Sequence, residues 1–165
     1  METFRSLSHV PLMQRFRTPE EVLLQVFGHR SFRPYQRRAI DELLAGRDVM
    51  VLAATGGGKS LCYQVPALLR DGLTVVISPL VALMQDQVRA LQARGVHAAC
   101  LHAQTSSDEM WEIRGQIDAD ELDLLYLTPE RVLRTGLPPR TSLIAVDEAH
   151  CVSLWGHQFR PDYGK

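Results

Sequence analysis

The sequence alternates between short apolar runs and longer segments in which apolar residues recur at helical spacing. Each run is bounded by glycine, proline or polar residues, which is typical of strands buried on both faces of a sheet. The predicted strands cover residues 49–53, 74–79, 98–103, 122–127 and 142–146. Strands that alternate with helices predict an α/β fold with an open, mostly parallel sheet flanked by helices.

Helix signals occupy the segments between these strands. Residues 18–21 begin a helix, because a capping threonine is followed by proline and then by two acids near the positive end of the helix dipole. That helix ends at Gly28, and the next one ends at Gly46. Further helices are predicted to begin near residues 61, 80 and 107. The first of these is expected to reach about Arg70, with a kink at Pro66.

Composition places the chain among globular domains. Its 165 residues suffice for one domain with a real core, which we assign to residues 18–165 after a lead-in at 1–17. The formal net charge of −1 argues against binding of nucleic acid through the overall charge of the chain, although a local basic groove is compatible with it.

The three cysteines form no Cys-x-x-Cys pair, so we expect neither a metal cluster nor a disulfide framework. This use of cysteine suggests a reducing compartment. No apolar run is long enough to cross a bilayer.

A glycine-rich turn follows the first predicted strand: residues 56–58 are glycines, and Lys59 and Ser60 come next. Glycines let the backbone turn tightly and point successive N–H groups inward, which forms a nest for a polyanion where a helix begins. Lys59, the only lysine besides the terminal residue, would reach the β- and γ-phosphates of a nucleotide, and Ser60 would bind Mg²⁺. The pattern G-x-x-x-x-G-K-[ST] has Ala53 in place of its first glycine. The alternative is a surface turn with a solvated lysine.

Two acids, Asp147 and Glu148, directly follow the last predicted strand. Open α/β sheets place their ligands at the carboxyl ends of strands. Asp147 would hold Mg²⁺, directly or through water, and Glu148 would polarise an attacking water. An exposed acidic turn is the alternative. Downstream of a phosphate loop, the pair favours phosphoryl transfer, which depends mainly on positioning and charge neutralisation.

Residues 147–153, Asp-Glu-Ala-His-Cys-Val-Ser, and the aromatic loop after them resemble the first motor domain of RecQ-type DNA helicases. These are superfamily 2 enzymes with a DEAH box that move 3′→5′ on DNA. The likeness covers residues 27–163. Further motifs appear in the family's order: Phe32-Arg33-Pro34 with Gln36, the segment 55–64, Ser78-Pro79-Leu80, and Thr128-Pro129-Glu130-Arg131. The resemblance implies a RecA-like ATPase domain and a role in DNA repair and recombination.

The resemblance also implies ligands and site residues. ATP and Mg²⁺ would be the cofactors, and single-stranded and forked DNA the partners. Gln36 would read the adenine edge with its amide, and His150 would relay the DNA-bound state to hydrolysis. The nucleotide-binding set would be Arg33, Gln36, Thr55, Gly56, Gly57, Gly58, Lys59 and Ser60. Base stacking and charge would come from Trp155, His157, Phe159 and Arg160. Core packing is the alternative for the two aromatic residues.

The sequence stops before the next motif of that family. We therefore expect the front piece of a longer helicase, without the second motor domain that supplies arginine fingers. By the same resemblance, a strand that normally separates 49–53 from 142–146 is absent, so both would have open edges and hydrolysis would be slow or absent. Two other classes stay open: a different phosphate-loop NTPase, and a chain that binds nucleotide or a partner without turnover. The expected compartment is the cytoplasm of a bacterium, or the nucleus of a eukaryote.

Overall fold

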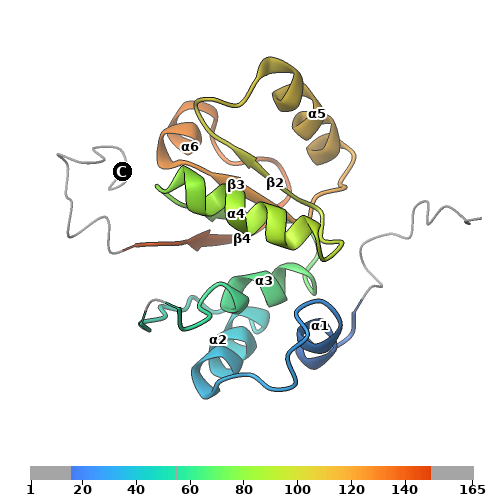
Figure 1. The fold of residues 1–165 in the computed structure, drawn as a ribbon, viewed down its shortest axis with the longest axis vertical. Helices are drawn as coiled ribbons and strands as arrows, with labels where there is room; N and C mark the ends of the chain where they lie inside the picture. Colours follow the sequence, from blue (N-terminus) through green and yellow to red (C-terminus); the bar gives the residue numbers. More distant parts are fainter. Residues whose placement is uncertain (1–15, 55, 150–165) are drawn as a thin grey trace, which may run out of the picture.

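The computed structural model describes residues 16–54 and 56–149, which form an α/β fold (Figure 1). The helices are α1 (Pro19–Gln25), α2 (Pro34–Leu44), α3 (Leu61–Ala67), α4 (Val81–Gln92), α5 (Ser107–Asp118) and α6 (Pro129–Thr135). The strands are β1 (Leu73–Ile77), β2 (Ala98–Leu101), β3 (Leu124–Leu127) and β4 (Thr141–Val146). The predicted α/β class is confirmed.

The strands of the described residues form one parallel sheet in the order β2-β3-β1-β4. β1 is central, and Val75 is in register with Leu125 of β3 and Ile144 of β4. Parallel neighbours need crossover connections, which here are made largely by helices. β4 therefore lies at one edge of the described sheet and β2 at the other.

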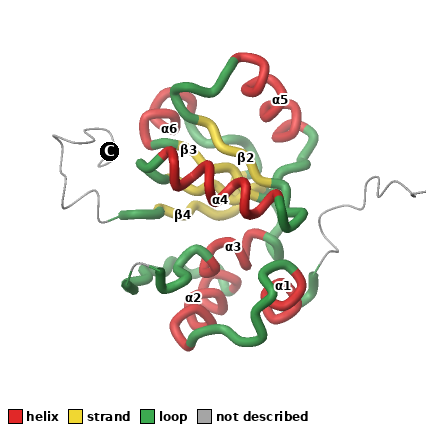
Figure 2. The backbone as a smooth tube through the Cα atoms, viewed as in Figure 1, coloured by secondary structure: helices red, strands yellow, loops and turns green. Residues whose placement is uncertain are grey.

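The sheet is covered on both faces, because side chains alternate along each strand. Val76 and Tyr126 face a core formed with α1, α2, α3 and α4. Val75 and Leu125 face a second core formed with α5 and α6. In Figure 2, α5 and α6 lie on the opposite side of the strands from α1, α2 and α3. Burial on both faces explains why the strands are almost continuously apolar.

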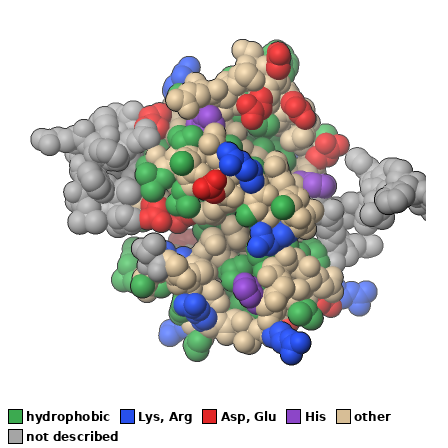
Figure 3. All heavy atoms as spheres, viewed as in Figure 1, with side chains coloured by type: hydrophobic (Ala, Val, Ile, Leu, Met, Phe, Trp, Pro, Cys, Tyr) green, Lys and Arg blue, Asp and Glu red, His purple; other side chains and the backbone are tan. Residues whose placement is uncertain are grey.

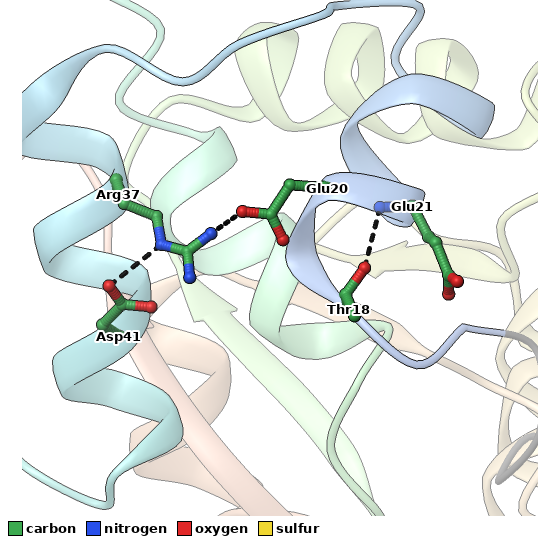
Figure 4. Close-up of polar contacts among 5 residues, drawn as sticks. All are labelled: Thr18, Glu20, Glu21, Arg37 and Asp41. Atoms are coloured by element: carbon green, nitrogen blue, oxygen red, sulfur yellow. Dashed lines mark hydrogen bonds and ion pairs between the residues drawn. The ribbon is translucent and has the colours of Figure 1, made fainter.

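Polar contacts tie the first two helices together (Figure 4). The Thr18 hydroxyl accepts the Glu21 N–H at 3.2 Å, as the capping signal predicted. Arg37 on α2 pairs with Glu20 on α1 and, at 2.9 Å, with Asp41 one turn along its own helix. These groups are exposed, so each pair contributes at most about 1 kcal/mol. They add little to the packing of α1 and α2, which both contribute buried side chains, Val22 and Ile40, to the core.

Four of the five predicted strands are confirmed, with bounds that differ by one or two residues, and the strand predicted at 49–53 is wrong. That segment has no ladder partner among the described residues, and Met50 and Leu52 are 86% and 89% exposed. A single strand is not stable without a neighbour to accept its hydrogen bonds. The apolar run alone could not show whether a second strand lies beside this segment in the fold.

Two helix predictions also need correction. α3 ends at Ala67 rather than near Arg70, because the N–H groups of Leu68 and Leu69 bond three residues back and tighten the last turn. α6 was not predicted, although Thr128 followed by Pro129 and Glu130 repeats the start signal of α1. Neither difference changes the topology of the sheet.

Candidate functional site

The glycine loop, residues 53–60, connects the extended segment before it to α3. Gly56 and Gly58 have φ of 75° and 78°, a region that side chains disfavour. A Cβ on Gly58 would lie 2.7 Å from Nε2 of Gln36, and one on Gly57 would lie 2.8 Å from the Ala54 carbonyl oxygen. Gly57 therefore requires glycine for lack of space against the backbone, whereas Gly58 requires it for its conformation, and a Cβ there would displace the Gln36 amide.

Lys59 closes this loop with its own side chain. Its ammonium donates to the carbonyl oxygens of Ala53 and Ala54, at 2.9 and 3.1 Å. The N–H groups of Gly58, Lys59 and Ser60 donate to no acceptor in the described part of the chain. A flexible cation beside several unpaired N–H groups is the arrangement that a phosphate chain requires.

The first turn of α2 supports the loop from outside. The Tyr35 hydroxyl donates to the Gly57 carbonyl, and Gln36 Nε2 donates to the Gly58 carbonyl at 2.9 Å. Gln36 Oε1 accepts the Arg33 N–H at 2.8 Å. The Gln36 amide thus braces the loop, and its part in adenine recognition stays a prediction. The loop contact of Tyr35 was missed, although the residue lies beside Gln36 in the segment that the sequence singled out.

The acidic pair lies at the carboxyl end of β4. The Asp147 N–H donates to the Ile77 carbonyl at 2.9 Å, which extends the β1–β4 pairing by one bond. Glu148 has a positive φ of 53°, and its N–H donates to Asp147 Oδ1 at 2.9 Å. A non-glycine residue in this region is uncommon and is concentrated at functional sites. The chain therefore turns sharply at the place where the two carboxylates are presented.

α3 joins the glycine loop to the acidic pair. It begins directly after Ser60, and the Tyr63 hydroxyl lies 3.1 Å from Asp147 Oδ2. Arg70, beyond the end of α3, donates to the Ser142 carbonyl of β4 at 3.1 Å, and Figure 1 shows α3 beside β4. Burial raises the pKa of Tyr63 well above its usual value, with added contributions from Tyr126 and Asp147. The hydroxyl is therefore neutral and remains a donor.

Several predicted site residues lie outside the described residues: Thr55, His150, Trp155, His157, Phe159 and Arg160. Their roles stay predictions. The structure brings Lys59 and Ser60 to the start of the helix whose Tyr63 contacts Asp147. Tyr63 itself was quoted only as part of a motif, and its contact with Asp147 joins residues 84 positions apart. No local sequence signal could have shown that contact.

A second concave surface lies at the carboxyl ends of β2 and β3. It is a cavity of about 320 Å³. Its walls are Val81, His102, Ala103, Gln104, Thr128, Glu130, Arg131 and Arg134. The charged groups are two arginines and one glutamate, so the wall has a positive excess. On the face shown in Figure 3, acidic side chains gather over α5 and arginines are spread over the remainder. Charge at this cavity is therefore local, as the net charge of the chain suggests.

The sequence profile of the DEAD/DEAH box helicase family matches residues 33–165. The chain belongs to that family. It is 46% identical over 159 residues to the ATP-dependent DNA helicase RecQ of Pasteurella multocida, and 48% identical over 151 residues to that of Synechocystis. These alignments cover 93% and 87% of this chain. The resemblance to RecQ-type helicases is thereby confirmed. The chain spans 25% and 32% of the length of these two curated relatives.

Solved structures agree on the fold. A hypothetical ATP-dependent RNA helicase from Sulfolobus tokodaii superposes with a TM-score of 0.67 at 21% identity, covering 84% of this chain and 43% of the other. The helicase MrfA bound to DNA and AMPPNP gives 0.66 at 19% identity, over 86% of this chain and 22% of the other. At these identities the likeness shows the fold alone, and it confirms the expected RecA-like arrangement. Within the described ranges, no helix is both long and apolar enough to cross a membrane.

Proposed function

We propose that this chain forms the ATP- and Mg²⁺-binding part of a RecQ-type DNA helicase motor. The observation that carries the proposal is the placement of α3, which begins at the glycine loop and contacts Asp147 through Tyr63. Phosphoryl transfer requires a phosphate-binding loop and an acidic group that can hold a metal ion beside it. Here one helix, α3, links the loop to the acidic end of β4. The names and identities of the curated relatives support DNA as the second ligand.

The loop residues suit a triphosphate. The N–H groups of residues 58–60 would donate to phosphate oxygens, and the Lys59 ammonium would leave the Ala53 and Ala54 carbonyls for the β- and γ-phosphates. The Ser60 hydroxyl and the Asp147 carboxylate are the oxygen donors for Mg²⁺, which neutralises charge on the transferred phosphoryl group when bound. Gln36, which braces the loop, and Arg33, whose N–H donates to the Gln36 amide oxygen, would meet the adenine.

Glu148 is the group we assign to proton removal from the attacking water. Its positive φ turns the backbone sharply after Asp147, and we assign different roles to the two neighbouring carboxylates. One holds the metal, and the other orients and deprotonates water. His150 follows two residues later and would link this site to DNA.

The DNA-binding part of the proposal rests on the aromatic loop and on the arginine-bearing cavity. Trp155 and Phe159 would stack on unpaired bases, with His157 and Arg160 beside them. Arg131 and Arg134 line the cavity at the carboxyl ends of β2 and β3 and would contact backbone phosphates. Unwinding in the 3′→5′ direction would involve a second motor domain. The protein would act where the chromosome lies, in the cytoplasm of a bacterium or the nucleus of a eukaryote.

Two other functions share part of this site. A different phosphate-loop NTPase would use the loop and the acidic pair and would have no use for the aromatic loop, so DNA would not stimulate its turnover. A chain that binds nucleotide without turnover would show affinity for ATP and no hydrolysis, with or without DNA. Comparing hydrolysis with and without single-stranded DNA separates the three.

Lys59→Ala tests the nucleotide site. We expect ATP affinity, measured by calorimetry, to fall about tenfold to a hundredfold, because a hydrogen bond to a charged group contributes roughly 1.5–3 kcal/mol. Arg89→Ala, which removes an exposed charge from α4, is the matched control and should bind ATP as the unaltered chain does. Equal affinity in all three proteins, with folding intact, would refute the phosphate loop.

Trp155→Ala tests the DNA site. Stacking on one base contributes about 1–3 kcal/mol by alanine substitution, so we expect weaker binding of a labelled single-stranded oligonucleotide in fluorescence anisotropy. Trp111→Ala is the control, since Trp111 is an exposed tryptophan on α5. If Trp155→Ala lowered folding stability and left DNA affinity unchanged, Trp155 would belong to the core.

A further inference from the structure

A chain of buried and partly buried polar side chains runs from α3 through α4 and β3 to the carboxylate that we assign to the metal. Its members are Tyr63, Gln64, Gln87, Tyr126 and Asp147. Tyr63, Gln64 and Tyr126 are buried, and Tyr126 is fully so. Buried polar groups are costly unless they are satisfied, and apart from Asp147 the steps of phosphoryl transfer do not use these side chains. Their arrangement therefore needs its own explanation.

Gln87 is the centre of this network. Its Oε1 lies 2.9 Å from the Tyr126 hydroxyl, 3.2 Å from Gln64 Nε2 and 2.8 Å from the Tyr63 hydroxyl. The two hydroxyls and the Gln64 amide nitrogen can all donate a hydrogen bond, so the atom of Gln87 that faces them is the amide oxygen, which accepts. Its nitrogen then faces Asp147, and Nε2 donates to Oδ2 at 3.2 Å. The network thereby fixes the orientation of the amide.

Counting protons assigns the role of Tyr63. A carbonyl oxygen has two lone pairs, and Tyr126 and Gln64 can fill both of those on Gln87. Each hydroxyl carries one proton. The Tyr63 hydroxyl lies 2.8 Å from Gln87 Oε1 and 3.1 Å from Asp147 Oδ2, and we assign its proton to Asp147 because a carboxylate is the stronger acceptor. Burial raises the pKa of Tyr126 to about 12, so this hydroxyl, like that of Tyr63, is protonated at neutral pH.

Asp147 is held at both oxygens. Oδ2 accepts from Gln87 and Tyr63, while Oδ1 accepts the Glu148 N–H at 2.9 Å. These donors come from three separate parts of the chain. A carboxylate with donors at both oxygens cannot rotate freely, so its remaining lone pairs point in set directions. Groups that orient a metal ligand in this way commonly change metal affinity when they are removed.

We propose that Gln87 and Tyr63 are positioning residues, which fix the Asp147 carboxylate so that it meets Mg²⁺ in a preset orientation. The proposal rests on the proposed function, because it needs Asp147 to be a metal ligand. It assigns to Gln87, on α4, a role in the nucleotide site through a side chain that contacts neither the nucleotide nor the metal. Its effect should appear in metal-dependent binding rather than in binding of the nucleotide alone.

The test measures the affinity of the full 165-residue chain for a fluorescent ATP analogue, once with Mg²⁺ and once with EDTA. The ratio of the two affinities is the readout, with thermal unfolding recorded in parallel. Gln87→Met removes all four hydrogen bonds of the amide at similar volume, and Tyr63→Phe removes one hydroxyl. Gln85→Met is the matched control, because Gln85 lies on the same helix and contacts His102 instead.

We expect Gln87→Met to lower the ratio about tenfold, the change typical of losing a charge-assisted hydrogen bond. Tyr63→Phe should lower it less, and Gln85→Met should leave it unchanged. Affinity in EDTA should stay as in the unaltered chain for all three variants. If Gln87→Met does not fold, Tyr63→Phe decides alone, since it removes a single oxygen atom.

Other results overturn the proposal. An unchanged ratio in Gln87→Met and Tyr63→Phe, with a lower unfolding temperature, would show that the network serves stability alone. A parallel fall of both affinities would show the same. If the unaltered chain binds no nucleotide in either condition, the proposed function fails and this inference falls with it. That outcome differs from the first two, in which the unaltered chain binds and responds to Mg²⁺.

Discussion

Gly58 and Gly95 have nearly the same backbone conformation and very different surroundings. Their φ angles are 78° and 75°. A Cβ at Gly95 would meet nothing within 4 Å, whereas one at Gly58 would strike Gln36 Nε2. A side chain at either position bears the left-handed strain of roughly 1–2 kcal/mol. At Gly58 it would in addition push away the residue that braces the loop.

This pair gives a matched prediction. Gly58→Ala should lower ATP affinity by about tenfold or more, because it displaces Gln36 and distorts the N–H groups next to it. Gly95→Ala should lower the free energy of unfolding by about 1–2 kcal/mol and leave ATP affinity as it was. Calorimetry and denaturant unfolding on both variants check this. Equal ATP affinity in the two would mean that the loop tolerates a side chain at position 58.

Among the elements, β4 is the most exposed strand. It pairs with β1 along one edge, and its other edge has no partner within the described ranges. Ile144 and Val146 are 48% and 53% exposed. An apolar edge strand with open hydrogen-bonding groups is a template for pairing with another chain. Natural sheets usually place a charge or proline at such an edge, and residues 141–146 contain neither.

We therefore expect the chain to self-associate through β4. Ile144→Lys should raise the concentration at which association begins severalfold, because an edge lysine opposes strand pairing. Leu24→Lys, at an exposed apolar position on α1, is the control and should not change association. Sedimentation velocity over a concentration series provides the measurement. A similar shift in both variants would point to general solubility rather than to the β4 edge.

For the molecule as a whole, the segment that leads into the glycine loop differs from the helix that follows it in regular structure and in burial. The sheet and its two cores hold residues 73 to 146, and α1–α3 pack on one face. The segment 49–53 forms no strand and exposes Met50 and Leu52. The glycine loop therefore begins from a segment that is not hydrogen-bonded to any described strand, and it ends on a helix, α3, that packs into the core.

Hydrogen exchange should report this difference. Amides of β1 should exchange slowest, because both of their neighbours are hydrogen-bonded strands and the side chains are buried. Amides of residues 49–53 should exchange at rates close to those of an unstructured peptide. Mass spectrometry on the isolated chain resolves the two peptides. Protection at 49–53 comparable with that of β1 would show that this segment pairs as a strand after all.

Local signals in the sequence were enough for most of the architecture. Apolar runs bounded by turn residues located β1 to β4, and capping residues such as Thr18 located helix starts, because both depend on neighbours a few positions away. The glycines with Lys59 and Ser60, and the acids after β4, located the two halves of the candidate site for the same reason, and their roles stay predictions. The family followed from the order of those motifs and was confirmed by the profile match.

Long-range contacts were decided in the folded chain. The sequence could not show that 49–53 has no strand partner among residues 16–54 and 56–149, since pairing depends on which segment lies alongside it. Nor could it show that Gln36 braces Gly58, or that Gln87 and Tyr63 converge on Asp147. These contacts join residues 22 to 84 positions apart, and they form because the sheet order places β1, β3 and β4 beside α3 and α4. Their directions are set by packing, which a linear pattern does not encode.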